Sequence, residues 1–305
     1  MKHISRISDF QLDHRNTTKK LDPIKPKKKE REKEKMSTIK MDLIDYSTYE
    51  TLSLVSKKRL VGEPMNYPLI VFDWDDTLFP TYWLASRGIT MQTSQIDIPK
   101  EIYIMCKKLE MMVKRLLEQA TRLGKVIIVT NAEIGWVEMT AERFMPSLLP
   151  LLNSMYCETT NTKVFDTLSA ITTPNTNYVE IISARTMYEN IYGISPQSWK
   201  IQAFQKLINN YEETNKMYEG FGFPLLAKRV LHVISIGDSE YERHAVHHAT
   251  KRMATSAVKT KSIKLINHPH VKNVMHQVKH IYRQLPQIVG HYDSFDSKLH
   301  MSVDV

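Results

Sequence analysis

Three carboxylates follow directly on a short apolar segment of the chain. Asp73, Asp75 and Asp76 come immediately after Leu69–Phe72. A continuous apolar run of this length predicts a strand that is buried on both faces, as in a parallel sheet, and open α/β sheets bind ligands beyond the carboxyl ends of their strands. Crowded carboxylates repel one another and lose hydration, so we expect a hard divalent cation with oxygen ligands, Mg²⁺, among them. A solvated turn or a helix cap is the alternative that this segment alone leaves open.

Two further strand ends and one helix carry side chains that could take part in catalysis or binding. A second apolar run, from residue 125 onward, ends in Thr130, and a third ends at Gly237, which allows a sharp turn and close approach to a ligand. Asp238 and Glu242 follow that glycine four residues apart. Between these strands, Lys200 lies near the start of a helix that Ser195 and Pro196 are expected to open.

In this order, the four segments resemble the motifs of the haloacid dehalogenase superfamily. The family's first motif is Asp-x-Asp-x-Thr after an apolar strand, filled here by Asp73, Asp75 and Thr77. Its second motif is a strand ending in Ser or Thr, its third a lysine near a helix start, and its fourth Gly-Asp-x-x-x-Asp or Glu. The resemblance covers roughly residues 69–242 and implies an α/β fold: a three-layer, Rossmann-like parallel sheet flanked by helices.

The resemblance also implies roles for individual residues. Asp73 would be the nucleophile, Asp75 the general acid and base, and Thr130 and Lys200 the ligands of the phosphoryl oxygens. Lys206 and Lys216 remain alternatives to Lys200, and Asp76 is expected to be structural. The implied magnesium ligands are Asp73, the main-chain carbonyl of Asp75, Asp238 and, in the outer shell or through water, Glu242.

These roles imply a Mg²⁺-dependent phosphatase that hydrolyses phosphomonoesters through an aspartyl-phosphate. The motifs do not separate a phosphatase from a phosphotransferase, and a catalytically silent binding or scaffold protein of the same fold is the alternative from another class. The stretch between Asp73 and Thr130 is too short for a large cap domain, and residues 132–199 must supply scaffold elements. We therefore expect a small or absent cap and an open site that admits a phosphoprotein or another bulky phosphate. A phosphorylated small molecule is the alternative substrate if a partner or an oligomer covers the site.

Charge is distributed unevenly along the 305 residues. Residues 1–40 carry 13 Lys and Arg against 6 Asp and Glu, whereas the rest of the chain carries 29 against 27. This composition predicts a disordered basic tail over 1–40, a linker or peripheral element over 41–66, a folded domain over 67–290 and a polar C-terminal tail over 291–305. The nearly neutral domain gives no reason to expect nucleic-acid binding.

Other features concern the cellular setting. Two cysteines, Cys106 and Cys157, offer no disulfide framework and fit a reducing compartment, the cytosol or the nucleus. The cluster Lys25–Lys29 is compatible with a nuclear-import signal, although a solvated tail is the plainer interpretation. No apolar run reaches the length of a membrane span, and nothing indicates an oligomeric state.

The remaining pattern predicts scaffold elements. Apolar residues at helical spacing indicate helices over 99–123 and 271–285, and residues 213–228 are expected to form a loop. A strand over 178–185 ends in Arg185, for which pairing with a surface carboxylate is favoured over contact with a substrate. Near the site, Tyr82 and Trp83 could line the entrance or pack in the core. The spacing of three histidines on a predicted helix favours an ordinary surface over a zinc site: His244, His247 and His248.

Overall fold

The computed structural model describes residues 68–154, 178–220, 230–251 and 258–299. The predicted tail over 1–40, the segment over 41–66 and Cys157 lie outside these ranges. The strands are β1 (Leu69–Phe72), β2 (Lys125–Thr130), β3 (Leu152–Ser154), β4 (Val179–Ser183), β5 (Leu231–Gly237), β6 (Val258–Lys264) and β7 (Phe295–Lys298). The helices are α1 (Thr81–Ser86), η1 (Gln95–Asp97), α2 (Lys100–Leu123), α3 (Trp136–Phe144), η2 (Pro146–Leu151), α5 (Ala184–Tyr192), α6 (Pro196–Gly220), α8 (Glu240–Lys251) and α9 (Val271–Gly290).

The strands form one parallel sheet in the order β3-β4-β2-β1-β5-β6-β7. The expected α/β fold is therefore confirmed. From the central strand β1 the chain first builds one half of the sheet and then, starting with β5, the other half. This reversal of direction beside β1 is the place where open parallel sheets hold their ligands.

The register brings the predicted site residues to one edge of the sheet. Phe72, the last residue of β1, is paired with Ile128 of β2 and with Ile236 of β5. Asp73 is therefore level with Val129, one position before the end of β2 at Thr130, and with Gly237 at the end of β5, after which Asp238 begins the loop.

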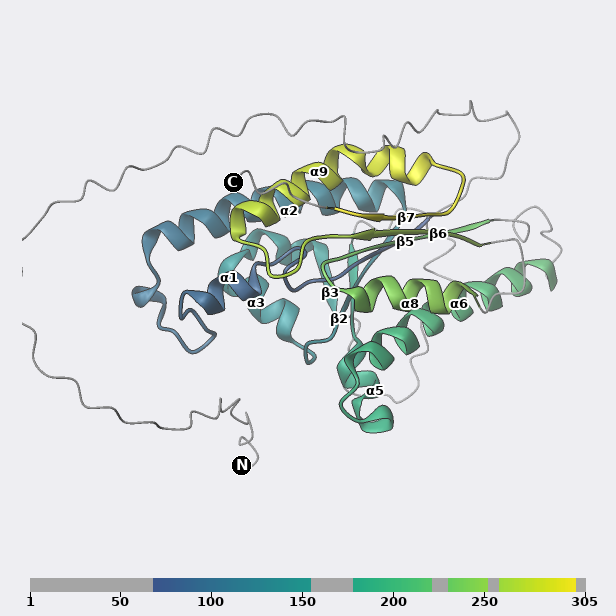
Figure 1. Ribbon diagram of the computed structural model, residues 1–305, viewed down its shortest axis with the longest axis horizontal. Helices are drawn as coiled ribbons and strands as arrows, with labels where there is room; N and C mark the ends of the chain where they lie inside the picture. Colours follow the sequence, from purple (N-terminus) through teal and green to yellow (C-terminus); the bar gives the residue numbers. More distant parts are fainter. Residues whose placement is uncertain (1–67, 155–177, 221–229, 252–257, 300–305) are drawn as a thin grey trace, which may run out of the picture. The chain divides into compact units, whose positions relative to one another are not determined.

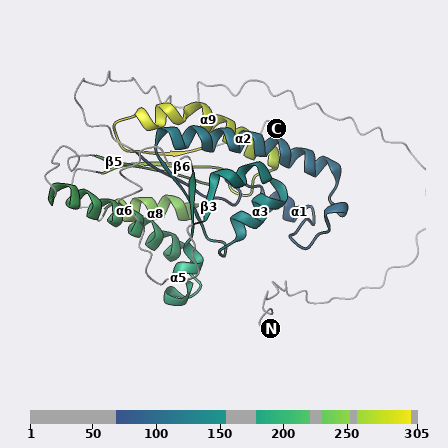
Figure 2. The same cartoon turned by 180° about the vertical axis from the view of Figure 1, so that it is seen from behind.

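Helices cover both faces of the sheet, so that β1 lies between two apolar cores. Ile70 and Phe72 face the core made with α2, α3 and α9, whereas Leu69 and Val71 face the core made with α5, α6 and α8. Figures 1 and 2 show α2 and α9 side by side along one face and α6 and α8 along the other. The alternation explains why β1 has no polar position: each side chain enters one of two cores.

The connection between β1 and β2 has no room for a large cap domain, as the sequence predicts. Its described elements are α1, η1 and α2, and α2 packs on the sheet through Cys106, Leu109 and Val113. Residues 81–99 are therefore the part of this connection that is free to border the site. None of the helices in the described ranges is both long and apolar enough to cross a membrane.

Three expectations for the scaffold are wrong. The strand expected over 178–185 ends at Ser183, and Arg185 lies in α5. Within the expected loop over 213–228, α6 continues to Gly220, because the segment before Gly220 holds no proline or glycine that would stop a helix. Within the expected polar tail over 291–305, Phe295–Lys298 form β7, which extends the sheet beyond residue 290. This edge strand is half exposed and held partly by ion pairs, so it has no apolar run to reveal it.

Candidate active site

Three acidic side chains meet at the carboxyl edge of the sheet, beside the end of β1. Asp73 is 6% exposed, and its backbone N–H donates to the carbonyl of Ile236 at 2.9 Å. Asp238 follows β5, and Glu242 projects from the first turn of α8. One carboxylate oxygen from each of Asp73, Asp238 and Glu242 lies within 4.8 Å of the others. The structure thus brings together both acidic segments that the sequence singles out.

Lys200 joins two of these acids. It is 1% exposed, and its Nζ donates to Oδ1 of Asp73 at 2.5 Å and to Oε1 of Glu242. Burial alone would lower the pKa of Lys200, but the carboxylates of Asp73 and Glu242 outweigh burial and raise it. The side chain is therefore a buried ammonium ion between two acids. Lys206, the alternative on the same helix, is exposed.

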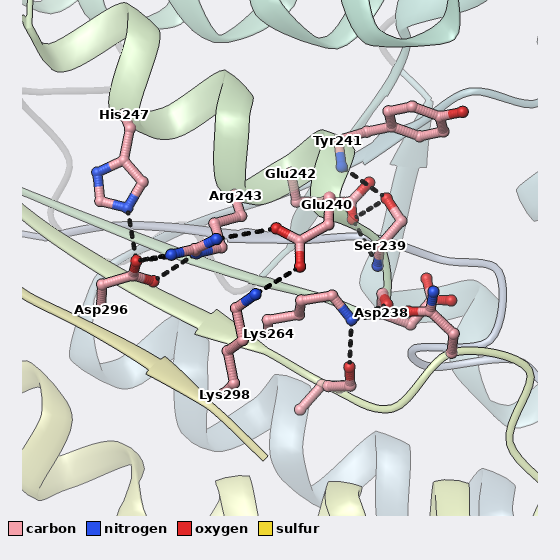
Figure 3. Close-up of polar contacts among 12 residues, drawn as sticks. Asp238, Ser239, Glu240, Tyr241, Glu242, Arg243, His247, Lys264, Asp296 and Lys298 are labelled. Carbon is pink, nitrogen blue, oxygen red and sulfur yellow. Dashed lines mark hydrogen bonds and ion pairs between the residues drawn. The ribbon is translucent and has the colours of Figure 1, made fainter. Parts of the chain in front are cut away.

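Glu242 has both carboxylate oxygens engaged. While Oε1 accepts from Lys200, Oε2 accepts from the backbone N–H of Ser239 at 3.0 Å and from its hydroxyl at 2.5 Å (Figure 3). Gly237 makes room for this arrangement, because a Cβ there would lie 2.7 Å from Oε2 of Glu242. Glu242 thus fixes Lys200 and the start of α8, which agrees with an outer position rather than direct coordination of a metal.

The acids outnumber the cation that faces them. Burial, followed by repulsion from Glu242, raises the pKa of Asp238 to about 7, and burial raises the pKa of Asp73 well above its ordinary value despite the nearby Lys200. Lys200 neutralises one negative charge of the three carried by the trio. A hard divalent cation that prefers carboxylate oxygens would neutralise the remainder, so the donor set fits Mg²⁺ at Asp73 and Asp238.

Asp75 lies at the rim of this cluster and accepts three hydrogen bonds. Its Oδ2 accepts from the hydroxyl of Thr130 at 3.4 Å, and its Oδ1 accepts from Trp136 Nε1 at 2.9 Å and from the hydroxyl of Thr81. The Thr130 hydroxyl in turn accepts the backbone N–H of Ala132 at 2.9 Å. Asp73, Asp75 and Thr130 are therefore neighbours, as the sequence predicts.

Asp76 shapes the loop that presents these residues. It has a left-handed backbone, with φ of 56°, and its carboxylate accepts the backbone N–H of Tyr82 at 2.8 Å. Burial raises its pKa to about 6. The aromatic side chains of Tyr82 and Trp83 have separate environments. The Tyr82 ring is half exposed and packs at a tilt against His268, with 4.6 Å between ring centres, whereas Trp83 is buried in the core.

Three further residues contact the site although nothing in the sequence singles them out. Thr81 and Trp136 bind Asp75, and Lys264 at the end of β6 donates to the main-chain carbonyls of Asp238 at 3.0 Å and Leu265 at 3.1 Å. Figure 3 shows Lys264 beside the loop that holds Asp238. Lysine and tryptophan at strand and helix ends are common, and only the fold reveals their partners.

Two residues with open interpretations lie outside the acidic cluster. Arg185 pairs with Glu189 at 2.9 Å and with Glu133 at 3.4 Å, which confirms the predicted surface pairing. His247 Nε2 on α8 lies 3.4 Å from Oδ2 of Asp296 in β7 (Figure 3). His244 and His248 are exposed on α8, as expected for an ordinary helix surface.

Comparison of the chain with models of protein families, with curated proteins and with solved structures gave no match. Functional inference therefore depends on the geometry of the site and on the motifs that the sequence contains.

Proposed function

We propose that this chain is a Mg²⁺-dependent phosphomonoester hydrolase of the haloacid dehalogenase superfamily that acts through an aspartyl-phosphate. The observation that carries the proposal is the buried ammonium of Lys200, bonded to both Asp73 and Glu242 although 127 residues separate it from Asp73. A structural ion pair needs one acid. A lysine between a nucleophile and a cluster of surplus carboxylates instead suits a site built to receive a dianion and a metal ion.

Asp73 is the nucleophile in this proposal. Its oxygen forms a bond to phosphorus while the bond from phosphorus to the leaving oxygen breaks, which divides a very slow hydrolysis into two easier displacements. Lys200 favours the ionised form of Asp73, against the burial that raises the pKa of this group, and offers positive charge to the incoming phosphoryl oxygens. Asp73, Asp238 and the main-chain carbonyl of Asp75 would hold Mg²⁺, which would offset the repulsion between carboxylate and phosphate dianion.

Asp75 and Thr130 handle the proton and the transferred group. Asp75 gives a proton to the leaving oxygen and then removes one from the water that attacks the aspartyl-phosphate. The Thr130 hydroxyl, fixed by the N–H of Ala132, is available to a phosphoryl oxygen. Its contact with Asp75 at 3.4 Å is long, as expected for a hydroxyl whose better partner is the substrate.

The surroundings of the site support a bulky substrate. Between β1 and β2 the elements available to cover the site are the six residues of α1 and the three of η1, since α2 belongs to the core. Such an open site suits a phosphoprotein or another large phosphate ester, which supplies its own surface to exclude water. A phosphotransferase uses the same first step and differs in the acceptor of the phosphoryl group.

The test is hydrolysis of p-nitrophenyl phosphate by the full chain, with Mg²⁺ and with EDTA. We expect Mg²⁺-dependent turnover that Asp73→Asn abolishes and that Asp97→Asn, an exposed acid in η1, leaves intact. Thermal unfolding of both variants controls for folding. If the folded wild type hydrolyses none of a panel of phosphate esters, the chain is the catalytically silent scaffold instead.

A further inference from the structure

We infer that Trp136 is a positioning residue that aims Asp75 at the leaving group; the inference depends on the proposed phosphatase activity. The indole of Trp136 donates to Oδ1 of Asp75 at 2.9 Å, across 61 positions of the chain. Indole nitrogen is a donor only, so this contact cannot reverse its direction. A fixed donor from a helix is therefore directed at the proposed acid and base.

A second indole bond runs in the opposite direction between the same two segments. Trp74, which lies between Asp73 and Asp75, donates from Nε1 to the hydroxyl of Thr140 on α3 at 3.0 Å. That hydroxyl donates onward to the carbonyl of Trp136 at 2.7 Å. Each segment therefore donates an indole N–H to the other, so two separate hydrogen bonds join α3 to the loop after β1.

The start of α3 is held in place as well. Gly135 has a left-handed backbone, with φ of 85°, directly before Trp136, and a side chain there would be strained. At the other end of the helix, the Phe144 ring packs on Phe79 with 5.6 Å between ring centres. The tryptophan therefore projects from a rigid helix and has only two side-chain torsions to fix.

The pattern of bonds at Asp75 decides which of its oxygens is free to face the leaving group. Oδ1 accepts from both Trp136 and Thr81, so its lone pairs are occupied by donors. Oδ2, which has the long contact from the Thr130 hydroxyl at 3.4 Å, is therefore the oxygen that serves the leaving group. In the proposed reaction Asp75 gives a proton to the leaving oxygen, which takes the electron pair of the broken bond to phosphorus. An alcohol leaves, Asp75 becomes a carboxylate, and Asp73 carries the phosphoryl group.

Substrates with different leaving groups separate positioning from general damage. p-Nitrophenolate leaves without a proton, whereas an alkoxide such as that of glycerol 2-phosphate needs one at the moment of bond cleavage. Trp136→Phe keeps the ring and removes the N–H. We expect its kcat for glycerol 2-phosphate to fall by about 100-fold, with little change in KM, because misplacing a catalytic group by about 1 Å costs that much. Its kcat for p-nitrophenyl phosphate should change by less than about threefold.

Trp74→Phe is the matched control, because it removes the other indole bond to α3 and leaves the one to Asp75 intact. It should affect both substrates by the same factor. Thr81→Val should repeat the selective loss and Thr81→Ser should restore activity, since only the hydroxyl bonds Asp75. Equal losses on both substrates in Trp136→Phe would overturn the inference and leave the phosphatase proposal standing.

Indole resonances provide a readout that needs no activity. The chain has four tryptophans, and the signal that Trp136→Phe removes is that of Trp136. In Asp75→Asn this signal should move, because its acceptor loses its charge, while the Trp199 signal, whose N–H donates to the carbonyl of Gly193 at 2.8 Å, should stay. An unmoved Trp136 signal would contradict the bond itself. Absence of turnover in the wild type would instead refute the proposed function, and the two failures are distinguishable.

Discussion

Replacing Lys200 by Met tests whether the buried ammonium holds the acidic cluster together. Methionine has nearly the same length and removes the charge and the donors. Asp73 and Glu242 then face each other, both almost fully buried, without the cation that bonds them. We expect the variant to be less stable than the wild type, with the whole loss due to the two carboxylates.

Two estimates set the size of the expected loss in unfolding free energy. Breaking a buried ion pair by removing one partner costs about 3–5 kcal/mol, because the other charge remains buried. The loss is limited, however, because a carboxyl group takes up a proton once that becomes cheaper than burying its charge. For a group with an ordinary pKa of about 4, protonation costs about 4 kcal/mol at pH 7 and about 1 kcal/mol at pH 5. We therefore expect Lys200→Met to lose about 4 kcal/mol at pH 7 and much less at pH 5.

Urea unfolding followed by circular dichroism, with EDTA present, measures both values. The sign follows from linkage: without Lys200 the folded state binds protons more tightly than the unfolded state, so lowering the pH favours folding. Lys108→Met, at an exposed position of α2, is the matched control and should change stability by less than about 0.5 kcal/mol. The reasoning is refuted if the two variants are equally stable at pH 7, or if the deficit of Lys200→Met grows at pH 5.

Three further changes test the surroundings. In urea unfolding at pH 8 with EDTA, Asp238→Asn should be more stable than the wild type by up to about 4 kcal/mol. The reason is the raised pKa of Asp238, because of which the folded wild type loses stability as the pH rises from about 4 to about 7. With Mg²⁺ in place of EDTA, the wild type should be the more stable of the two. Gly237→Ala should cost about 1–3 kcal/mol in urea unfolding, since its Cβ would strike Glu242, whereas Gly290→Ala, with open space around it, should gain up to about 1 kcal/mol. Arg243→Met should speed amide hydrogen exchange in β7 and lower global stability by less than about 1 kcal/mol, because its partners are exposed acids.

Each of these expectations has an outcome that contradicts it. If the wild type is more stable than Asp238→Asn in EDTA, the acidic cluster does not carry the surplus negative charge that we infer. Equal effects at the two glycines would mean that Glu242 moves freely. Unchanged exchange in β7 would mean that the contacts of Arg243 in Figure 3 do not hold that strand.

The sequence predicts the parts of this molecule that repeat a strong local pattern. β1, β2 and β5 are apolar runs that end in distinctive polar residues, so both their existence and the meeting of Asp73, Thr130 and Asp238 at one edge follow from parallel pairing. Its place near a helix start favours Lys200 over Lys206 and Lys216, and its burial between two acids agrees with that prediction.

Other parts depend on pairings that no local pattern contains. β7 is short and polar, and it exists because β6 offers an edge and because Arg243 and Lys298 hold it. Trp136 begins a helix with nothing beside it in the sequence to indicate that its indole reaches Asp75. Such contacts arise when segments far apart in the chain fold together, and they are visible only in three dimensions.

Strand β1 contributes alternate side chains to two cores, so it cannot shift without disturbing the packing on both faces of the sheet. Any breathing motion that shifts Ile70 must also disturb Val71 on the other face. The proposed nucleophile Asp73, which follows β1, is therefore held as rigidly as the two cores. Tyr82 and His268 pack against each other at the surface and belong to neither core. Laboratory evolution toward new ligands thus has most freedom at the rim, where exchanging side chains leaves the reacting centre unmoved.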